Sequence, residues 1–373
     1  MRIAVDIRPL AEPYPSGVSR YTAELLSALL RDYGQRHRFT LFSYGRREVP
    51  ADQRALYLRL GVRYHHWRWP SKLVNGMSIL RLLPGIDRLA GGSDVLFVPN
   101  MNYLSVSGRC RLVCTVHDLS YTHPGFYGVR AQLWHRMVGP GRIFRRADSL
   151  IAVSEFTKRD VVHTYRVPEG RVQVVRSGVN REQFMAPSDT AAVRVRQRYQ
   201  LSEPYVLFLG NVEPRKNIPG LLEAWRILQT SPFPYQLVLA GSVVDPSWLR
   251  RHPGVRFLGY IPEEDKPALY RGATLFVYPS FYEGFGMPVL EAMASGCPVI
   301  TSQATALPEV AGDAAILVDP YNVNELAEAI RQVATQESLR RSLIESGLRR
   351  VEQFTWKRAA AETMAVLERV GAQ

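Results

Sequence analysis

The chain has few cysteines, no long apolar run and no sign of a leader segment. Its 373 residues include only Cys110, Cys114 and Cys297, which lie in apolar, strand-like segments without Cys-x-x-Cys spacing. This pattern predicts buried, reduced thiols of a cytosolic protein. No apolar segment approaches the roughly 20 residues that a membrane-spanning helix needs. The N-terminal residues 1–8 are typical of a short charged strand rather than a signal peptide.

Residues that would hold a metal ion or a dinucleotide are missing as well. The eight histidines do not cluster with carboxylates at ligand spacing, and no Asp-x-Asp motif occurs. We therefore expect no metal site and no cofactor. Neither of the two predicted sheets opens with Gly-x-Gly-x-x-Gly, which argues against a dinucleotide-dependent dehydrogenase.

Charge is distributed unevenly along the chain. Residues 1–182 contain 28 Lys and Arg against 14 Asp and Glu, a balance of +14, whereas the remainder contains 19 against 20, a balance of −1. A basic half predicts an anionic partner. No nucleic-acid-binding motif is present, so we expect no nucleic-acid partner. An anionic membrane surface fits better, because basic, aromatic and aliphatic residues share the same segments, most clearly residues 62–83.

Strand-like runs alternate with helical patterns, which predicts an α/β fold with parallel sheets wrapped by helices. The length suits two domains. The first series of strands covers 3–7, 39–44, 62–66, 94–99, 111–117, 149–154 and 173–177, with a helix over 18–33. The second covers 205–210, 236–240, 255–258, 274–278, 299–301 and 315–318, with helices over 218–229, 322–335 and 337–354. We place an N-terminal domain at 1–182, a polar connection at 183–203, a C-terminal domain at 204–356 and a last helix at about 357–373.

The most informative segment, EGFGMPVLE, places Glu283 and Glu291 eight positions apart around a Gly-x-Gly loop. It joins a strand-like run to a helix with Pro288 in its first turn. Free N–H groups at such a helix start attract phosphate. The flanking carboxylates can accept hydrogen bonds from the hydroxyls of a ribose or a hexose. Together these features predict a site for a sugar nucleotide.

Polar residues follow other predicted strands at the same kind of position. Arg215 and Lys216 come after the first strand of the second series, where ligands of parallel α/β sheets bind. Two adjacent cations can neutralise a pyrophosphate, the arginine as a planar fork and the lysine as a point charge. In the first half, His117 ends a strand and is expected to face the cleft between the domains. Gly17 follows the first strand and allows a backbone to approach phosphates.

Residues 283–302 (EGFGMPVLEAMASGCPVITS) resemble the signature of the retaining glycosyltransferase family 4, and the resemblance extends over essentially the whole chain. It implies the GT-B fold, in which two Rossmann-like domains face each other across a cleft and the C-terminal helix crosses back onto the N-terminal domain. The segments 6–9 and 16–21 look most like those of bacterial mannosyltransferases of surface-polysaccharide assembly.

The resemblance also implies roles for individual residues. Glu291 would accept hydrogen bonds from the ribose, Glu283 would contact the transferred sugar, and His117 would lie beside the anomeric centre. The diphosphate would lie on Arg215 and Lys216. Further donor contacts are expected from Gly17, Gly210, Tyr260, Ile261, Gly284, Phe285, Gly286 and Leu290. Residues expected at the acceptor side or cleft, each of which also fits a solvated or structural role, are Arg20, Asp118 and Ser154.

The expected activity is metal-independent, retaining transfer of a hexose from a nucleotide diphosphate to a hydroxyl of a glycan or lipid-linked glycan. GDP-mannose is the first expectation for the donor and a UDP-hexose the second. The enzyme would work in the cytoplasm, including the inner face of the plasma membrane. Two alternatives remain open: a catalytically silent sugar-nucleotide-binding scaffold, and a glycogen-synthase-like or phosphorolytic enzyme of the same fold. The basic, aromatic first domain argues against the second alternative.

Overall fold

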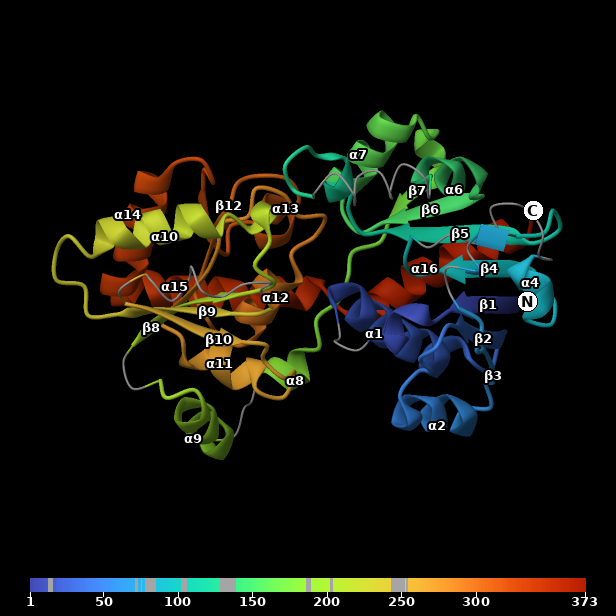
Figure 1. Ribbon diagram of the computed structural model, residues 1–373, viewed down its shortest axis with the longest axis horizontal. Coiled ribbons are helices and arrows are strands. Elements are labelled where there is room, and N and C mark those ends of the chain that lie inside the picture. The colour runs from blue at the N-terminus through green and yellow to red at the C-terminus, as the bar shows by residue number, and fades with distance from the viewer. Residues whose placement is uncertain are drawn as a thin grey trace. The chain divides into compact units, whose positions relative to one another are not determined.

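The computed structural model describes residues 1–12, 16–70, 73–74, 76–77, 85–101, 106–127, 139–185, 189–201, 204–242, 252 and 254–373. The chain divides into two compact units, each with its own sheet (Figure 1). Unit 1 comprises Met1–Leu119, Val129–Gly178 and Trp356–Gln373, and unit 2 comprises Ser120–Gly128 and Val179–Thr355.

In the described part of unit 1, seven parallel strands form one sheet in the order β3-β2-β1-β4-β5-β6-β7. Most of them are buried along their length, as expected for a parallel sheet covered on both faces. The edge strand β3 is only half-buried. The strands are β1 (Arg2–Asp6), β2 (Arg38–Tyr44), β3 (Arg63–Trp67), β4 (Val95–Val98), β5 (Arg111–Val116), β6 (Ser149–Ala152) and β7 (Val172–Val174).

Helices α1 and α16 come from opposite ends of the sequence and pack against each other in unit 1. Helix α1 starts after Ser16, whose hydroxyl accepts a hydrogen bond from the Ser19 N–H at 3.2 Å. The Tyr21 ring of α1 meets the Trp356 ring of α16 edge-on at 5.8 Å. The expected return of the C-terminal helix to the first domain is therefore confirmed (Figure 1). Helices of unit 1 whose bounds lie in the described part are α1 (Gly17–Tyr33), α2 (Ala51–Arg59), α4 (Ile86–Leu89), α6 (Pro140–Arg146), α7 (Glu155–Tyr165) and α16 (Trp356–Gly371).

In the described part of unit 2, six parallel strands form a sheet in the order β10-β9-β8-β11-β12-β13. The strands are β8 (Tyr205–Leu209), β9 (Gln236–Ala240), β10 (Val255–Gly259), β11 (Leu275–Tyr278), β12 (Val299–Ser302) and β13 (Ile316–Val318). The helices are α8 (Arg181–Met185), α9 (Asp189–Arg198), α10 (Ile218–Leu228), α11 (Lys266–Gly272), α12 (Met287–Ala294), α13 (Leu307–Ala311), α14 (Val323–Thr335) and α15 (Glu337–Arg350). Both units are parallel α/β sheets, as the sequence predicted.

The segment expected to be a connection, residues 183–203, is largely helical in its described part. Helix α9 packs on α11 at the edge of unit 2 (Figure 1). The reason is an ion-pair cluster: Arg194 and Arg198 of α9 bind the buried carboxylate of Asp265 at 3.0 and 2.9 Å. Sequence reasoning interpreted this polar segment as a connection between the domains, but its charged residues attach helix α9 to unit 2.

Candidate functional site

The cations and the first glutamate predicted for the site lie together at the carboxyl edge of the unit 2 sheet. After β8 the chain forms a tight turn over Pro214–Lys216. Asn217 closes this turn in the left-handed conformation, with φ +56°, and starts α10 by accepting from the Gly220 N–H at 3.2 Å. Its amide also donates to the Pro320 carbonyl at 2.7 Å. The turn is thus anchored on both sides, which fixes the direction of the two cations.

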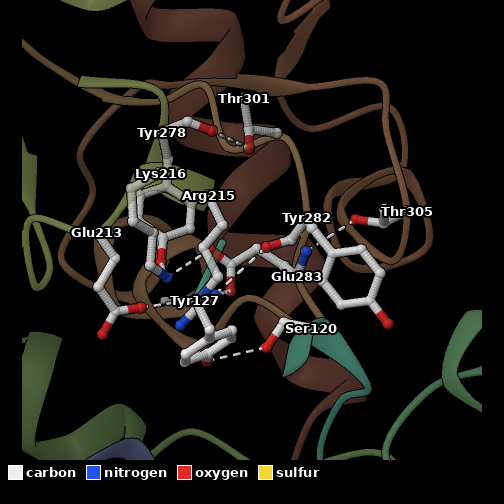
Figure 2. A network of polar contacts seen from close by, with 10 residues as sticks. All are labelled: Ser120, Tyr127, Glu213, Arg215, Lys216, Tyr278, Tyr282, Glu283, Thr301 and Thr305. Atoms are coloured by element: carbon white, nitrogen blue, oxygen red, sulfur yellow. Dashed lines mark hydrogen bonds and ion pairs between the residues drawn. The ribbon is translucent and has the colours of Figure 1, made fainter. Parts of the chain in front are cut away.

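Arg215 and Lys216 converge on the Glu283 carboxylate (Figure 2). Arg215 Nη1 donates to Glu283 Oε2 at 2.8 Å, and its Nε donates to Glu213 Oε2, also at 2.8 Å. Lys216 Nζ donates to Glu283 Oε1 and to the Tyr278 hydroxyl. Lys216 and Glu283 are both buried, at 5% and 6% exposure. Two cations and two carboxylates therefore balance one another in this cluster.

Burial and charge act in opposite directions on the Glu283 carboxyl. Burial alone would raise its pKa, but Arg215 and Lys216 outweigh burial and lower the pKa to about 2. For Lys216, burial lowers the pKa and the proximity of Arg215 adds to this, whereas Glu283 counteracts both. The glutamate is ionised at neutral pH, so it can accept hydrogen bonds but cannot donate one.

The glycine loop after Glu283 leads directly into α12. Gly286 has φ +115° and precedes the first turn, and a Cβ there would lie 2.7 Å from Leu307 Cδ2, so the position needs glycine. Helix α12 begins with Met287 and Pro288, so the positive end of its dipole lies at the glycine loop. Of the other predicted loop residues, Gly284 lies between Glu283 and Phe285. The rings of Phe285 and Phe354 meet edge-on at 6.0 Å.

Glu291 lies on α12 and is buried, with 4% exposure. The Tyr270 hydroxyl of α11 donates to Glu291 Oε2 at 3.1 Å. Sequence reasoning did not find Tyr270, because no local pattern links it to the glutamate. The neighbouring Leu290 is fully buried, which makes it a packing residue of α12.

A row of glycines at the ends of β8, β9 and β10 extends the site. Gly210, Gly241 and Gly259 follow or end these adjacent strands. Gly241 has φ +137°, and a Cβ there would lie 2.0 Å from the Gly210 carbonyl oxygen, so this close backbone approach needs glycine. Beyond the row, Tyr260 is 42% exposed, whereas Ile261 is buried. The sequence does show a glycine at the end of each of these three strand-like runs, but only Gly210 was predicted as a site residue.

A short segment from the first half of the sequence also belongs to unit 2. The His123 ring lies 4.6 Å from the Tyr282 ring, next to Glu283. The Ser120 and Tyr127 hydroxyls are 3.1 Å apart, and Figure 2 shows both residues on the side of the cluster where Arg215 lies. Sequence reasoning placed this segment in the N-terminal domain, because its position along the chain was the only guide.

In unit 1, His117 follows β5 as predicted. Its Nε2 lies 2.7 Å from the Pro99 carbonyl oxygen, which accepts a hydrogen bond and so requires the proton to be on Nε2. Burial lowers the pKa of His117, and the ring packs edge-on against Tyr21 at 4.7 Å. The neutral ring therefore presents Nδ1 as a hydrogen-bond acceptor.

The remaining predicted residues of unit 1 differ in what the structure assigns to them. Among the described residues, leaving aside the neighbours of Gly17 in the chain and the backbone of its own helix, no atom lies within 4 Å of a Cβ at Gly17, so packing against these residues does not demand glycine there. Arg20 is half-buried in the first turn of α1, and Asp118 is half-buried after β5. Ser154 is fully buried and caps α7 by accepting from the Thr157 N–H at 3.0 Å. Ser154 thus supports a helix, and we do not propose it as a ligand contact.

Within the described ranges, His, Cys, Asp and Glu side chains form no group of three or more that could hold a metal ion. In the same part of the chain, every helix is too short or too polar to cross a bilayer. The three cysteines are unpaired and buried.

Comparisons with known proteins match this architecture. The family model "Glycosyl transferases group 1" matches residues 190–350, and "Glycosyltransferase Family 4" matches residues 15–183. O-antigen chain mannosyltransferase B of Escherichia coli is 35% identical over 264 residues, which cover 68% of this chain and 69% of that protein. The serotype-specific mannosyltransferase WbdA of Escherichia coli is 32% identical over 232 residues, which cover 58% of this chain but only 28% of WbdA.

Among solved structures, HepE of Anabaena in complex with UDP and glucose superposes with a TM-score of 0.74 at 18% identity, over 99% of both chains. Two parallel α/β units with this superposition define the GT-B fold. The chain belongs to glycosyltransferase family 4.

Proposed function

We propose that the protein is a retaining, metal-independent hexosyltransferase that uses a nucleotide diphosphate sugar, with GDP-mannose as the first candidate donor. The observation that carries the proposal is the convergence of Arg215 and Lys216 on Glu283 at the start of a glycine loop and α12. The names of the Escherichia coli relatives support mannose. The UDP and glucose bound to HepE support a nucleotide-sugar donor and leave a UDP-hexose as the second candidate.

In the proposed complex the donor diphosphate replaces Glu283 as the partner of the two cations. Arg215 offers its planar fork, and Lys216 has three N–H donors, of which Glu283 and Tyr278 use two. The released Glu283 carboxylate accepts from hydroxyls of the transferred sugar. Glu291 accepts from the ribose hydroxyls, and the base lies near Tyr260 and Ile261.

Catalysis in this scheme is electrostatic. As the bond between the anomeric carbon and the diphosphate breaks, negative charge grows on the leaving group, and preorganised cations stabilise it more than water would. The leaving phosphate takes the proton of the acceptor hydroxyl, which attacks from the same face. His117 accepts through Nδ1 from a sugar hydroxyl. Product with inverted anomeric configuration, seen by NMR, would refute this mechanism.

Two measurements test the function itself. A thermal-shift screen of GDP, UDP, ADP and their sugars identifies the base, because a ligand that binds the native state raises the melting temperature. Release of nucleoside diphosphate is then measured with the tightest-binding sugar nucleotide, with and without glycan or lipid-linked glycan acceptors. We expect release to increase with a competent acceptor. Binding without turnover under all conditions would instead identify a silent scaffold.

We further propose that unit 1 binds the acceptor and rests on anionic lipid at the inner face of the plasma membrane. Residues around β3 support this, since Arg63 and Arg68 are exposed and Trp69 is 42% exposed, with its ring near that of Trp67. Leu73 is 57% exposed and so does not face the core. Part of the segment 62–83, including Lys72, Leu80, Arg81 and Leu83, lies outside the described residues.

Cosedimentation with vesicles tests the membrane proposal. Binding should require anionic lipid and decrease with salt, because salt screens surface charges beyond roughly 10 Å at 0.1 M. Arg68→Glu should weaken it, whereas Arg341→Glu, an exposed arginine of unit 2, serves as the matched control. Equal binding to neutral and anionic vesicles would contradict the proposal.

A further inference from the structure

Thr305 has a backbone conformation that is rare for its residue type. In the described part of the chain, four non-glycine residues have positive φ, and Thr305, with φ +59°, is the β-branched one among them. A branched Cβ crowds the backbone in this left-handed region, so the conformation is strained and persists only where surrounding contacts enforce it. Such strained residues cluster at ligand sites, where their conformation is part of the function.

Thr305 and the residue after it both bind the backbone of Glu283. The Glu283 N–H donates to Thr305 Oγ1 at 3.0 Å, and the Ala306 N–H approaches the Glu283 carbonyl oxygen at 3.4 Å. Figure 2 shows the Thr305 side chain directed at the Glu283 backbone, on the side opposite Lys216. Leu307, two residues after Thr305, packs against the glycine loop, since its Cδ2 would lie 2.7 Å from a Cβ at Gly286.

The loop that carries Thr305 is itself well anchored. Ser302 Oγ accepts from the Ala304 N–H at 2.9 Å, and the Gln303 N–H donates to the Val318 carbonyl oxygen at 2.9 Å. These bonds tie the loop to the ends of β12 and β13. A rigid loop therefore presents a single side-chain oxygen to the amide of Glu283, and the left-handed backbone is what aims it there.

We propose that Thr305 is a positioning residue for the donor site, which holds the Glu283 backbone so that the carboxylate can reach the transferred sugar. The inference rests on the proposed function, because Glu283 is the residue proposed to contact that sugar. In this proposal the Glu283 carboxylate can exchange its cation partners for sugar hydroxyls without a shift of the loop. Its backbone is fixed by Thr305 and Ala306, independently of what its carboxylate binds.

Three substitutions separate the hydroxyl from the strain. Thr305→Ser keeps the oxygen, Thr305→Val keeps the shape but loses the oxygen, and Thr305→Gly loses the oxygen while relieving the backbone. We expect Thr305→Ser to stay within about twofold of wild type. The valine and glycine variants should lose about tenfold to a hundredfold in kcat, the range expected when a reacting group is misplaced by up to an ångström. Their KM for the donor and affinity for the nucleoside diphosphate should change little, because Glu291 and Arg215 are untouched.

A stability measurement and a control exclude simple misfolding. Thr305→Gly should melt no lower than Thr305→Val, because glycine adopts positive φ without strain. Arg166→Gly, a control at φ +53° in unit 1, should relieve strain without changing kcat. Wild-type kcat in both the glycine and the valine variants would overturn the positioning role. So would a loss in Thr305→Ser as large as that in Thr305→Val.

Hydrogen exchange at the Glu283 amide gives a readout that does not depend on activity. Exchange should accelerate in the valine and glycine variants and stay slow in Thr305→Ser, since only the serine oxygen can accept the bond. Unchanged exchange in all three variants would refute the role of Thr305. If wild-type protein transfers no sugar from any nucleotide sugar tested, the proposed function fails, while the exchange rates still decide whether Thr305 holds Glu283.

Discussion

Replacing Glu283 by glutamine should destabilise unit 2 and, at the same time, increase its response to nucleotide. The substitution keeps the shape of the side chain but leaves Arg215 and Lys216 without their shared carboxylate. Lys216 is buried and loses its carboxylate partner, which is costly, whereas Arg215 retains Glu213 as a partner. A bound diphosphate would supply the missing charge, so the variant should recover stability when nucleotide is added.

The size of the effect follows from the pKa of Glu283, which is lowered from 4.5 to about 2. Glutamine resembles the protonated carboxyl, so the variant loses the free energy by which the folded protein favours the ionised carboxylate over the protonated form. At about 1.4 kcal/mol per pKa unit this is on the order of 3 kcal/mol. For a domain of this size, each kcal/mol shifts the melting temperature by about 2–4 °C, so we expect a decrease of roughly 6–12 °C at pH 7.

The pH dependence has a definite sign. Because the folded-state pKa is depressed, the stabilisation is fully present above about pH 4.5 and is lost as pH falls towards about 2. The difference between wild type and Glu283→Gln should therefore be constant from pH 8 to 5 and decrease below pH 4.5. Near pH 3.5 it should be roughly 2 kcal/mol.

Thermal unfolding with and without GDP or UDP measures all three effects. Glu337→Gln is the matched control, because Glu337 is 64% exposed and pairs with Arg341 on the surface of the same unit. Its melting temperature should hardly change. Equal melting temperatures for the two variants would refute the reasoning. So would a difference that stays constant through pH 3.5, or a smaller nucleotide shift in Glu283→Gln than in wild type.

Three further predictions concern turnover. Arg215→Ala should cost on the order of 2.7–4 kcal/mol in the catalytic step, as when an oxyanion-type donor is lost, and a decrease in kcat below about tenfold would exclude that role. Glu291→Ala should raise the Kd for the donor more than it lowers kcat, because the residue is assigned to the ribose. Calorimetry measures the Kd, and an unchanged value would leave Glu291 only the structural role of binding Tyr270. Activity should persist in excess EDTA, since cationic side chains can stabilise the leaving diphosphate, and complete loss that magnesium or manganese restores would contradict metal-independent transfer.

Sequence reasoning predicted the segments of the candidate site but not the partners of their side chains. The strands around the site are short apolar runs, because parallel strands are buried on both faces, and this signal is local. The glycine loop and Pro288 at the start of α12 are local signals too. Lys216 illustrates the limit. It was expected as a point charge for the diphosphate, and the structure shows it buried between Glu283 and Tyr278, which lie more than 60 positions away in the sequence.

The sequence by itself determined the class of fold and the family and predicted the segments of the candidate site, because these follow from strand, helix and motif patterns that can be read directly along the chain. Only the tertiary structure decided that Arg215 and Lys216 share one carboxylate, that residues 120–127 lie in unit 2, and that a strained Thr305 holds Glu283. These contacts join loops that follow different strands. Such loops meet only because parallel strands end at the same sheet edge, and their side-chain pairing depends on geometry that no local pattern encodes.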